Sequence, residues 1–215
     1  MQYTAVIPVK KNSSRLPGKN IKQFGGENLL VRKIRQVKKS GIADRIIVSS
    51  DSHEMLDIAT TEGVEGILRP VYLADESRSL CEFFDYIANL ITKGHLIWSC
   101  VTSPFFDEIL MAQAKKEYEM ALTLGYDSLI TVYDFHHYLM NENGPLNYSL
   151  GVEHQNSQDL NSIQLFTNGI LFSPIEQVRE LRYNYGPNAY RLKVSQKASI
   201  DIDTKLDYLA ALSWL

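Results

Sequence analysis

A loop rich in cations follows the first apolar run of the chain. Lys10, Lys11, Arg15 and Lys19 lie within ten residues, and the first acid of the chain is Glu27. Successive backbone N–H groups in such a loop can form an anion site, while arginine offers phosphate a planar fork and lysine a compact charge. The sequence lacks both the GxxxxGK[ST] and the GxGxxG pattern. The loop therefore favours a polyphosphate site without a known phosphate-binding motif; the alternative is a connection whose lysines are only solvated.

A pair of carboxylates lies near the other end of the chain. Asp201 and Asp203 are two residues apart in the segment SIDIDT. If this segment is extended, both point to one face, while Ile200 and Ile202 point into the core. Mg²⁺ typically takes one or two protein carboxylates together with substrate phosphates and water. The pair therefore suits a hard cation; the alternative is two exposed acids stabilised by the dipole of a following helix.

The two features complement each other chemically. A bound metal ion neutralises charge on a reacting phosphate, and fixed cations hold a leaving pyrophosphate. A cationic phosphate loop and a carboxylate pair are thus the parts that transfer of a nucleotidyl group needs.

Alternating strands and helices must position these parts. Apolar runs predict buried strands, and 3.6-residue periodicity predicts the helices between them. This alternation indicates an α/β fold with a mostly parallel sheet, which binds ligands at the carboxyl ends of its strands. The expected strands are 3–9, 45–50, 64–68, 96–101, 128–133, 165–173 and 190–194, an extended segment is expected at 199–203, and the expected helices are 28–39, 52–62, 80–92, 108–122, 174–181 and 204–215.

The alternation weakens over residues 134–164. This segment is rich in Asn, Ser, Gln and His, has no clear period and is long for a loop. We expect a small excursion from a single domain that spans 1–215, either a hairpin over the site or an arm to a partner subunit. His136 and His137 have no third metal ligand at a suitable spacing, so we expect them at the surface or at a subunit contact.

Composition excludes several classes of protein. The chain has 215 residues and a net charge of −3, which argues against nucleic-acid binding by charge. No apolar run is long enough to span a membrane, and the first residues do not resemble a signal peptide. Cys81 and Cys100 have the surroundings of reduced, buried thiols in a cytoplasmic protein. Five cations of the helix over 28–39 are expected on its solvated face: Arg32, Lys33, Arg35, Lys38 and Lys39.

Several segments, taken in order, resemble the sugar-acid cytidylyltransferases. The opening loop IPVKKNSSRLPGKN is similar to their IPARxxSxxxPxKN, and SIDIDTKLD matches their signature closely. Further similar segments are DRIIVSSD at 44–51, ILRPVYLADESRS at 67–79, TSP at 102–104 and Asn168-Gly169. The most similar branch is the acylneuraminate type, the CMP-sialic acid synthetases, to which the CMP-Kdo synthetases are related.

This resemblance implies a three-layer, Rossmann-like fold of the nucleotide-diphospho-sugar transferase (GT-A-like) type. It implies that CTP and a 2-keto sugar acid, a sialic-acid-like nonulosonate, give a CMP-sugar and pyrophosphate in a cytoplasmic homodimer. Arg15, Lys19 and Asp203 would be catalytic, and Asp201 and Asp203 would hold Mg²⁺. The implied nucleotide-binding residues are Pro8, Lys10, Asn12, Ser13, Ser14, Arg15, Lys19, Asn20, Arg69 and Ser79, and the implied contacts of the sugar acid are Thr102, Ser103, Gln158, Asn168 and Gly169.

The chain departs from the family pattern mainly on the acid side. Lys10 stands where the family has arginine, Cys100 stands where a glutamine is common, and the arginines usual before the Asn168-Gly169 pair are missing. Two alternatives to a nonulosonate enzyme therefore stay open. The acid could be Kdo or another carboxylated acid, or the chain could be a non-catalytic nucleotide-binding protein on the same scaffold.

Overall fold

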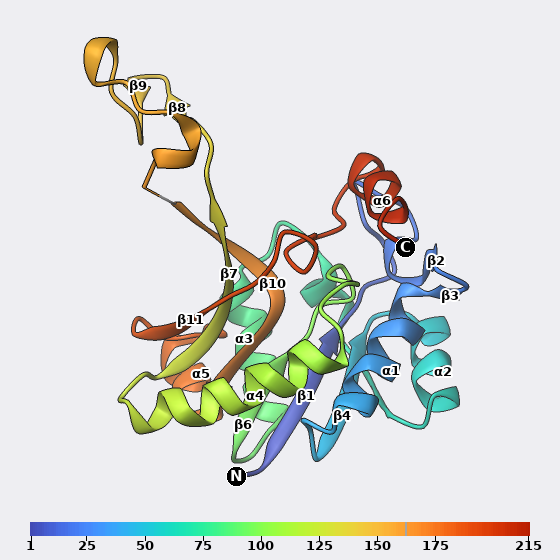
Figure 1. Cartoon of the computed structure of the whole chain (residues 1–215). Helices are drawn as coiled ribbons and strands as arrows, with labels where there is room; N and C mark the ends of the chain where they lie inside the picture. The colour runs from blue at the N-terminus through green and yellow to red at the C-terminus, as the bar shows by residue number, and fades with distance from the viewer. Residues whose placement is uncertain (162) are drawn as a thin grey trace.

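The computed structural model describes residues 1–161 and 163–215, and a seven-stranded sheet runs through the middle of this part of the chain (Figure 1). Its strand order is β11-β7-β10-β6-β1-β4-β5. β10 runs antiparallel to both of its neighbours, and every other adjacent pair is parallel. The prediction of a mostly parallel sheet is therefore confirmed. The strands are β1 (Tyr3–Pro8), β4 (Arg45–Ser50), β5 (Glu65–Leu68), β6 (His95–Trp98), β7 (Ser128–Phe135), β10 (Ile163–Pro174) and β11 (Ala189–Lys193).

Helices cover both faces of the sheet, which gives the three layers expected for this fold class. On one face α1 (Leu29–Ser40), α2 (His53–Thr61) and α4 (Glu108–Thr123) bury Leu30, Met55 and Tyr118 in one core. On the other face α3 (Leu80–Leu90) and α5 (Ile175–Leu181) bury Phe84 and Val178 in a second core. None of the described helices has both the length and the apolar character that a membrane crossing requires.

Local signals fix the helices that flank the site. α1 begins after Asn28, whose side chain accepts a hydrogen bond from the Val31 N–H, and ends at Gly41 in the left-handed conformation. α6 (Lys205–Leu212) begins with a capping box formed by Thr204 and Asp207. It packs near the short hairpin of β2 (Gln23–Phe24) and β3 (Glu27–Asn28), which the sequence did not predict (Figure 1).

The segment 199–203, which we expected to be extended, is not part of the seven-stranded sheet. The segment is an irregular loop, because its backbone pairs with the end of another loop rather than with a strand: the Ile202 N–H donates to the Thr102 carbonyl at 2.8 Å. The side-chain pattern still holds in part. Ile202 is fully buried and Ile200 is half-buried, while Asp201 and Asp203 are both partly accessible.

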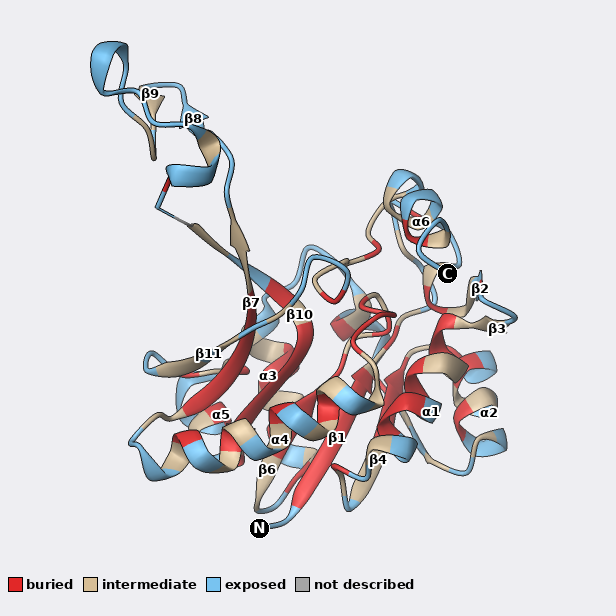
Figure 2. Ribbon diagram, viewed as in Figure 1, coloured by how far each residue is buried: buried red, intermediate tan, exposed pale blue. Residues whose placement is uncertain are grey.

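The segment 134–164 forms an arm that extends away from the sheet (Figures 1 and 2). Its described part contains the small hairpin of β8 (Met140–Asn141) and β9 (Gly144–Pro145) and two turns of 3-10 helix, Gly151–Glu153 and Ser157–Asp159. Residue 162, which also belongs to the predicted excursion, lies outside the described residues. Most residues of the arm are exposed, in contrast to the buried central strands (Figure 2).

Candidate functional site

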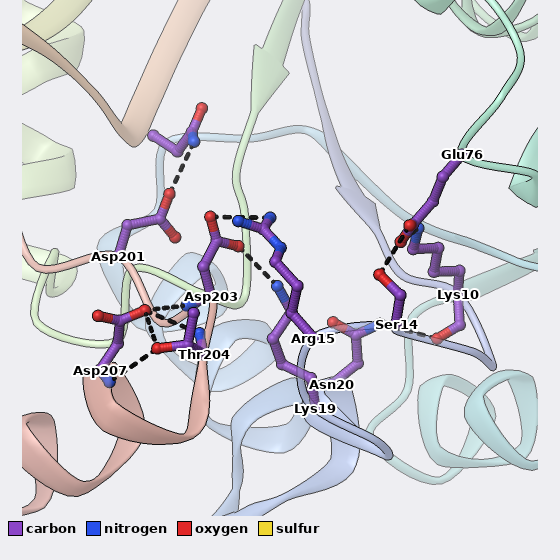
Figure 3. A network of polar contacts seen from close by, with 11 residues as sticks. Lys10, Ser14, Arg15, Lys19, Asn20, Glu76, Asp201, Asp203, Thr204 and Asp207 are labelled. Carbon is purple, nitrogen blue, oxygen red and sulfur yellow. Dashed lines mark hydrogen bonds and ion pairs between the residues drawn. The ribbon is translucent and has the colours of Figure 1, made fainter.

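The cationic loop and the carboxylate pair, which lie at opposite ends of the sequence, meet in the folded chain. The loop leaves the carboxyl end of β1 and reaches Asp203, whose carboxylate contacts Arg15 Nη2 at 3.0 Å and Lys19 Nζ at 2.9 Å (Figure 3). Lys19 and Asp203 are 184 positions apart in the sequence. The structure thus brings the three residues predicted to be catalytic into one cluster.

Asp201 lies beside this cluster and has one carboxylate oxygen left over. Asn168 Nδ2 donates to Asp201 Oδ2 at 2.8 Å, whereas Oδ1 is buried and has no hydrogen-bond partner among the described residues. An unsatisfied buried carboxylate oxygen is unusual and fits a cation. The described residues contain no group of three metal-ligating acids, histidines or cysteines, so the remaining ligands of a Mg²⁺ ion would be substrate phosphates and water.

A cavity of about 480 Å³ adjoins Arg15 and Lys19. Arg69 lines its wall with only 4% of its surface exposed, and it donates from Nη2 to the Val9 carbonyl at 2.8 Å. Its guanidinium lies 4.5 Å from the centre of the Phe83 ring, and burial lowers its pKa. Its Nε is buried and has no hydrogen-bond partner in the part of the chain that the structure describes. The cavity can therefore take a planar polar group at Arg69 and phosphates at the loop. Of the predicted site residues it is lined by Pro8, Lys10, Arg15, Lys19, Asn20, Arg69, Ser79 and Thr102.

Internal contacts hold the cationic loop in shape. Asn20 is almost fully buried, and its amide donates to the Lys10 carbonyl at 2.8 Å. The Lys11 N–H donates to Asp51 at 2.8 Å. Three of the predicted nucleotide-binding residues face a neighbouring cavity of about 530 Å³ instead of the one at Arg69: Asn12, Ser13 and Ser14.

Glu76 is a site residue that the sequence analysis missed. Its carboxylate contacts Lys10 Nζ at 2.5 Å and accepts from Ser14 Oγ at 2.8 Å (Figure 3). These two contacts lower the pKa of Glu76 to about 2. The acid therefore stays ionised and holds two groups that would otherwise be free to bind phosphate. The available signal was an acid in the segment 67–79, which resembles a family motif.

The predicted contacts of the sugar acid separate into two groups. Thr102, Asn168 and Gly169 lie near Asp201, whereas Gln158 is exposed on the arm. A Cβ atom on Gly169 would come within 2.6 Å of the Phe106 ring, so this position in the bulge of β10 requires glycine. Ser103 is only 2% exposed, and its carbonyl accepts a hydrogen bond from Lys33 Nζ at 2.9 Å.

A larger cavity of about 660 Å³ lies along β7, β10 and β11. Phe166, two positions before Asn168 on β10, lines it together with Tyr185 and Gln164. Among the described residues of its wall, Arg191 is the one charged side chain, and it donates to Gln164 Oε1 at 3.2 Å. The sequence carried no signal for Arg191, because it stands on an exposed edge strand without a motif.

Two titratable groups with shifted pKa values, the partly buried Cys100 and the fully buried Lys33, lie close to the site. Cys100 lines the cavity at Arg69, and burial raises the pKa of its thiol to about 12, so it is no thiolate nucleophile at neutral pH. Lys33 was predicted on a solvated face, and this prediction was wrong: the side chain is fully buried, and burial lowers its pKa to about 7. Lys33 is four positions from both Leu29 and Val37, which are buried too, so helical spacing could have placed it.

Comparisons with known proteins agree with this geometry. A family model described as cytidylyltransferase matches residues 4–212. The chain is 25% identical over 220 residues to a pseudaminic acid cytidylyltransferase of Campylobacter jejuni subsp. jejuni serotype O:23/36, with 96% of this chain and 93% of that protein covered. It is 24% identical over 220 residues to an N-acylneuraminate cytidylyltransferase of Escherichia coli O18:K1:H7, with 97% of this chain and 51% of that protein covered. Its fold is similar to a solved CMP:2-keto-3-deoxy-manno-octonic acid synthetase complexed with CTP, with a TM-score of 0.68, 13% identity and coverage of 99% and 100%.

Proposed function

This chain belongs to the cytidylyltransferase family and is a nucleotidyltransferase, and we propose that it couples CTP to a nonulosonate, a sialic-acid-like 2-keto sugar acid. One observation carries the proposal: Arg15 and Lys19 meet the carboxylate of Asp203, beside an Asp201 with a buried oxygen that no described residue satisfies. A phosphate-binding pair of cations and a metal-binding pair of acids are thereby held at one point. This also argues against a non-catalytic binding protein, which needs no such acid pair.

In the proposed reaction, the oxygen of the anomeric hydroxyl forms a bond to the α-phosphorus of CTP. The bond from that phosphorus to the oxygen bridging to the β-phosphate breaks, pyrophosphate leaves with its electron pair, and the hydroxyl proton passes to solvent. Arg15 and Lys19 hold the phosphates and offset the charge that develops on the leaving group. When bound by Asp201 and Asp203, Mg²⁺ would supply Lewis-acid polarisation of the reacting phosphate.

The nucleotide would lie in the cavity at Arg69. The Nε of the buried Arg69 guanidinium has no partner within residues 1–161 and 163–215, which suits an acceptor of the base or ribose. Lys10 and Ser14 would exchange the Glu76 carboxylate for phosphate oxygens, because both ligands are anionic and use the same donors. The chain would thus keep its phosphate donors paired until CTP arrives.

The identity of the acid is supported by the relatives and by the cavity at Arg191. Two relatives that match nearly the whole of this chain are named for pseudaminic acid and for N-acylneuraminic acid, which are both nonulosonates. A nonulosonate carries a polar exocyclic tail, and the cavity along β10 begins two residues from Asn168. We place the reacting end of the acid at Asn168 and its tail in this cavity, where Arg191 and Gln164 would bind polar oxygens.

We further propose that the arm contacts a second copy of the chain. Leu146, Leu150 and Val152 are all strongly exposed on it, and apolar side chains gathered on a projecting arm indicate an interaction surface. A homodimer would bury them. Light scattering on the wild type and on a Leu150→Asp, Val152→Asp double variant tests this: a dimer that becomes a monomer supports the proposal, and a wild-type monomer rejects it.

Pyrophosphate release tests the reaction. CTP, ATP, GTP and UTP are each assayed with Mg²⁺ against N-acetylneuraminate, legionaminate, pseudaminate and Kdo, with Asp203→Asn as the inactive control. We expect release with CTP and one nonulosonate. Release with Kdo alone would reject a nonulosonate as the acid but support the transfer reaction. CTP binding without release would mean that the acid is not in this panel. Release with another nucleotide, or no nucleotide binding, would reject the proposal itself.

A further inference from the structure

Side chains of helix α1 donate hydrogen bonds to the loop between β6 and α4. We define the 102–106 turn as residues 102–106, which include the TSP segment. Three side chains of α1 donate to its carbonyl groups: Lys33 Nζ to Ser103 O at 2.9 Å and to Phe106 O at 3.2 Å, Gln36 Nε2 to Pro104 O at 2.9 Å, and Arg32 Nε to Pro104 O at 3.2 Å. One helix therefore satisfies three carbonyl groups of the turn.

Among these three donors, Lys33 is the one whose burial costs the most folding free energy. It is fully buried, and none of the ion pairs formed within residues 1–161 and 163–215 involves it. Burial of an ammonium group without a carboxylate partner destabilises a fold, and an apolar side chain of similar volume is often tolerated as well or better at such a place. Packing alone therefore does not account for a lysine here.

The turn that Lys33 holds is connected to the carboxylate pair in two independent ways. The Thr102 carbonyl accepts the Ile202 N–H at 2.8 Å, and Ile202 is the buried residue between Asp201 and Asp203. Phe106, which is fully buried, packs against Gly169, whose neighbour Asn168 donates to Asp201 Oδ2. The 102–106 turn thus contacts both the backbone next to Asp201 and the segment that carries Asn168, the side-chain partner of Asp201.

We propose that Lys33 is a positioning residue for nucleotidyl transfer: through the 102–106 turn it fixes where Asp201 and Asp203 stand. It touches neither nucleotide nor acid in this arrangement. Its effect reaches the reaction through the placement of the two carboxylates, and small displacements at a reacting centre lower turnover strongly. The inference rests on the proposed function for its kinetic readout, but not for its binding readout.

The test replaces the ammonium while keeping the volume, in Lys33→Met, with Lys39→Met as the control on the exposed side of the same helix. Turnover is measured with Mg²⁺, CTP binding by calorimetry, and Mn²⁺ binding by electron paramagnetic resonance without any acid. For Lys33→Met we expect kcat to fall by roughly 10- to 100-fold and Mn²⁺ binding to weaken, while the affinity for CTP measured without metal stays near that of the wild type. Lys39→Met should match the wild type in all three.

A folded Lys33→Met protein that binds Mn²⁺ and turns over like the wild type would overturn the inference. If that variant does not fold, Gln36→Met replaces it, since it removes one hydrogen bond to Pro104 O from the same support and should shift both readouts in the same direction by less. An unchanged Gln36→Met protein would then count against the inference. If the wild type releases no pyrophosphate with any acid, the proposed function fails, but the comparison of Mn²⁺ binding still decides the role of Lys33.

Discussion

The buried charge of Lys33 predicts a specific dependence of stability on pH. Burial lowers the pKa of Lys33 to about 7 in the folded chain, against 10.5 for an unperturbed lysine. Between these two values the unfolded chain binds one proton more than the folded chain. The free energy of unfolding therefore rises with pH. The destabilisation caused by burying the charge of Lys33 is complete below pH 7 and disappears as the pH approaches 10.5.

The groups around Lys33 set the direction of this shift. Desolvation is its largest cause, and Arg32 on the same helix lowers the pKa further. Cys100 and Asp107, from the segments that pack over α1, raise it, but not enough to offset the desolvation. One proton corresponds to about 1.4 kcal/mol per pH unit. Because the transition is half complete at pH 7, the expected gain in the free energy of unfolding from pH 7 to pH 9 is about 2 kcal/mol.

Urea unfolding of the wild type and of Lys33→Met at pH 6, 7, 8 and 9 measures this gain. Other groups titrate in both proteins, so the difference between the two free energies of unfolding isolates Lys33. We expect that difference to change by about 2 kcal/mol in favour of the wild type between pH 7 and pH 9. A difference that is flat with pH would show that Lys33 keeps an ordinary pKa, and would refute the reasoning from burial.

Three further substitutions test the site directly. Asp203→Asn should lower turnover by about 100-fold or more with little change in the melting temperature, because Ile202 anchors that segment; unfolding well below the wild type would show that Asp203 is structural. Lys19→Ala should raise KM for CTP by roughly 10-fold and leave KM for the acid unchanged, so an unaltered KM for CTP would remove Lys19 from the phosphate site. Glu76→Gln should tighten CTP binding a few-fold in calorimetry, because it removes an anion that competes for Lys10 and Ser14; weaker binding would show that Glu76 supports the nucleotide instead.

The first half of the fold could be predicted because its signals are local. The apolar run RIIVSS predicts strand 45–50 with the bounds that β4 has. Asn28 and Gly41 mark the two ends of α1 by side-chain capping and by a left-handed backbone. These signals lie within a few residues of the element they define, so tertiary contacts do not need to be known.

The order and direction of the strands could not be predicted in the same way. β10 inserts between β6 and β7 and runs antiparallel to both, yet the apolar pattern of its residues 165–173 is compatible with either direction. The segment 199–203 shows the opposite case. Its alternation of apolar and acidic residues predicts an extended segment with Ile202 buried, but the Ile202 N–H donates to the Thr102 carbonyl, a loop group, and not to a strand. Alternation predicts which side chains are buried, whereas a strand also needs a neighbour.

The residues of the site also differ in whether the sequence predicts them. The meeting of Arg15 and Lys19 with Asp203 follows from complementary charges and from the resemblance of both segments to one family. Glu76 and Arg191 carry no such pairing in the sequence, since each depends on which loop or strand comes to lie beside it. Contacts between segments that only the fold brings together are therefore the part of the site that could not be predicted from the sequence.

Lys33 lies between these cases, and it shows how position and residue type can conflict. Its type placed it with the four other cations of α1 on a solvated face, whereas its spacing from Leu29 and Val37 places it on the buried face. Geometry decides such a conflict, because a side chain cannot leave the face to which its Cα belongs. A lysine on the apolar stripe of a helix must then either reach an exposed edge or find carbonyl acceptors inside, and at Lys33 the acceptors are those of the 102–106 turn. A lysine or arginine on the buried face of a helix therefore predicts that carbonyl groups of a nearby loop accept hydrogen bonds from it.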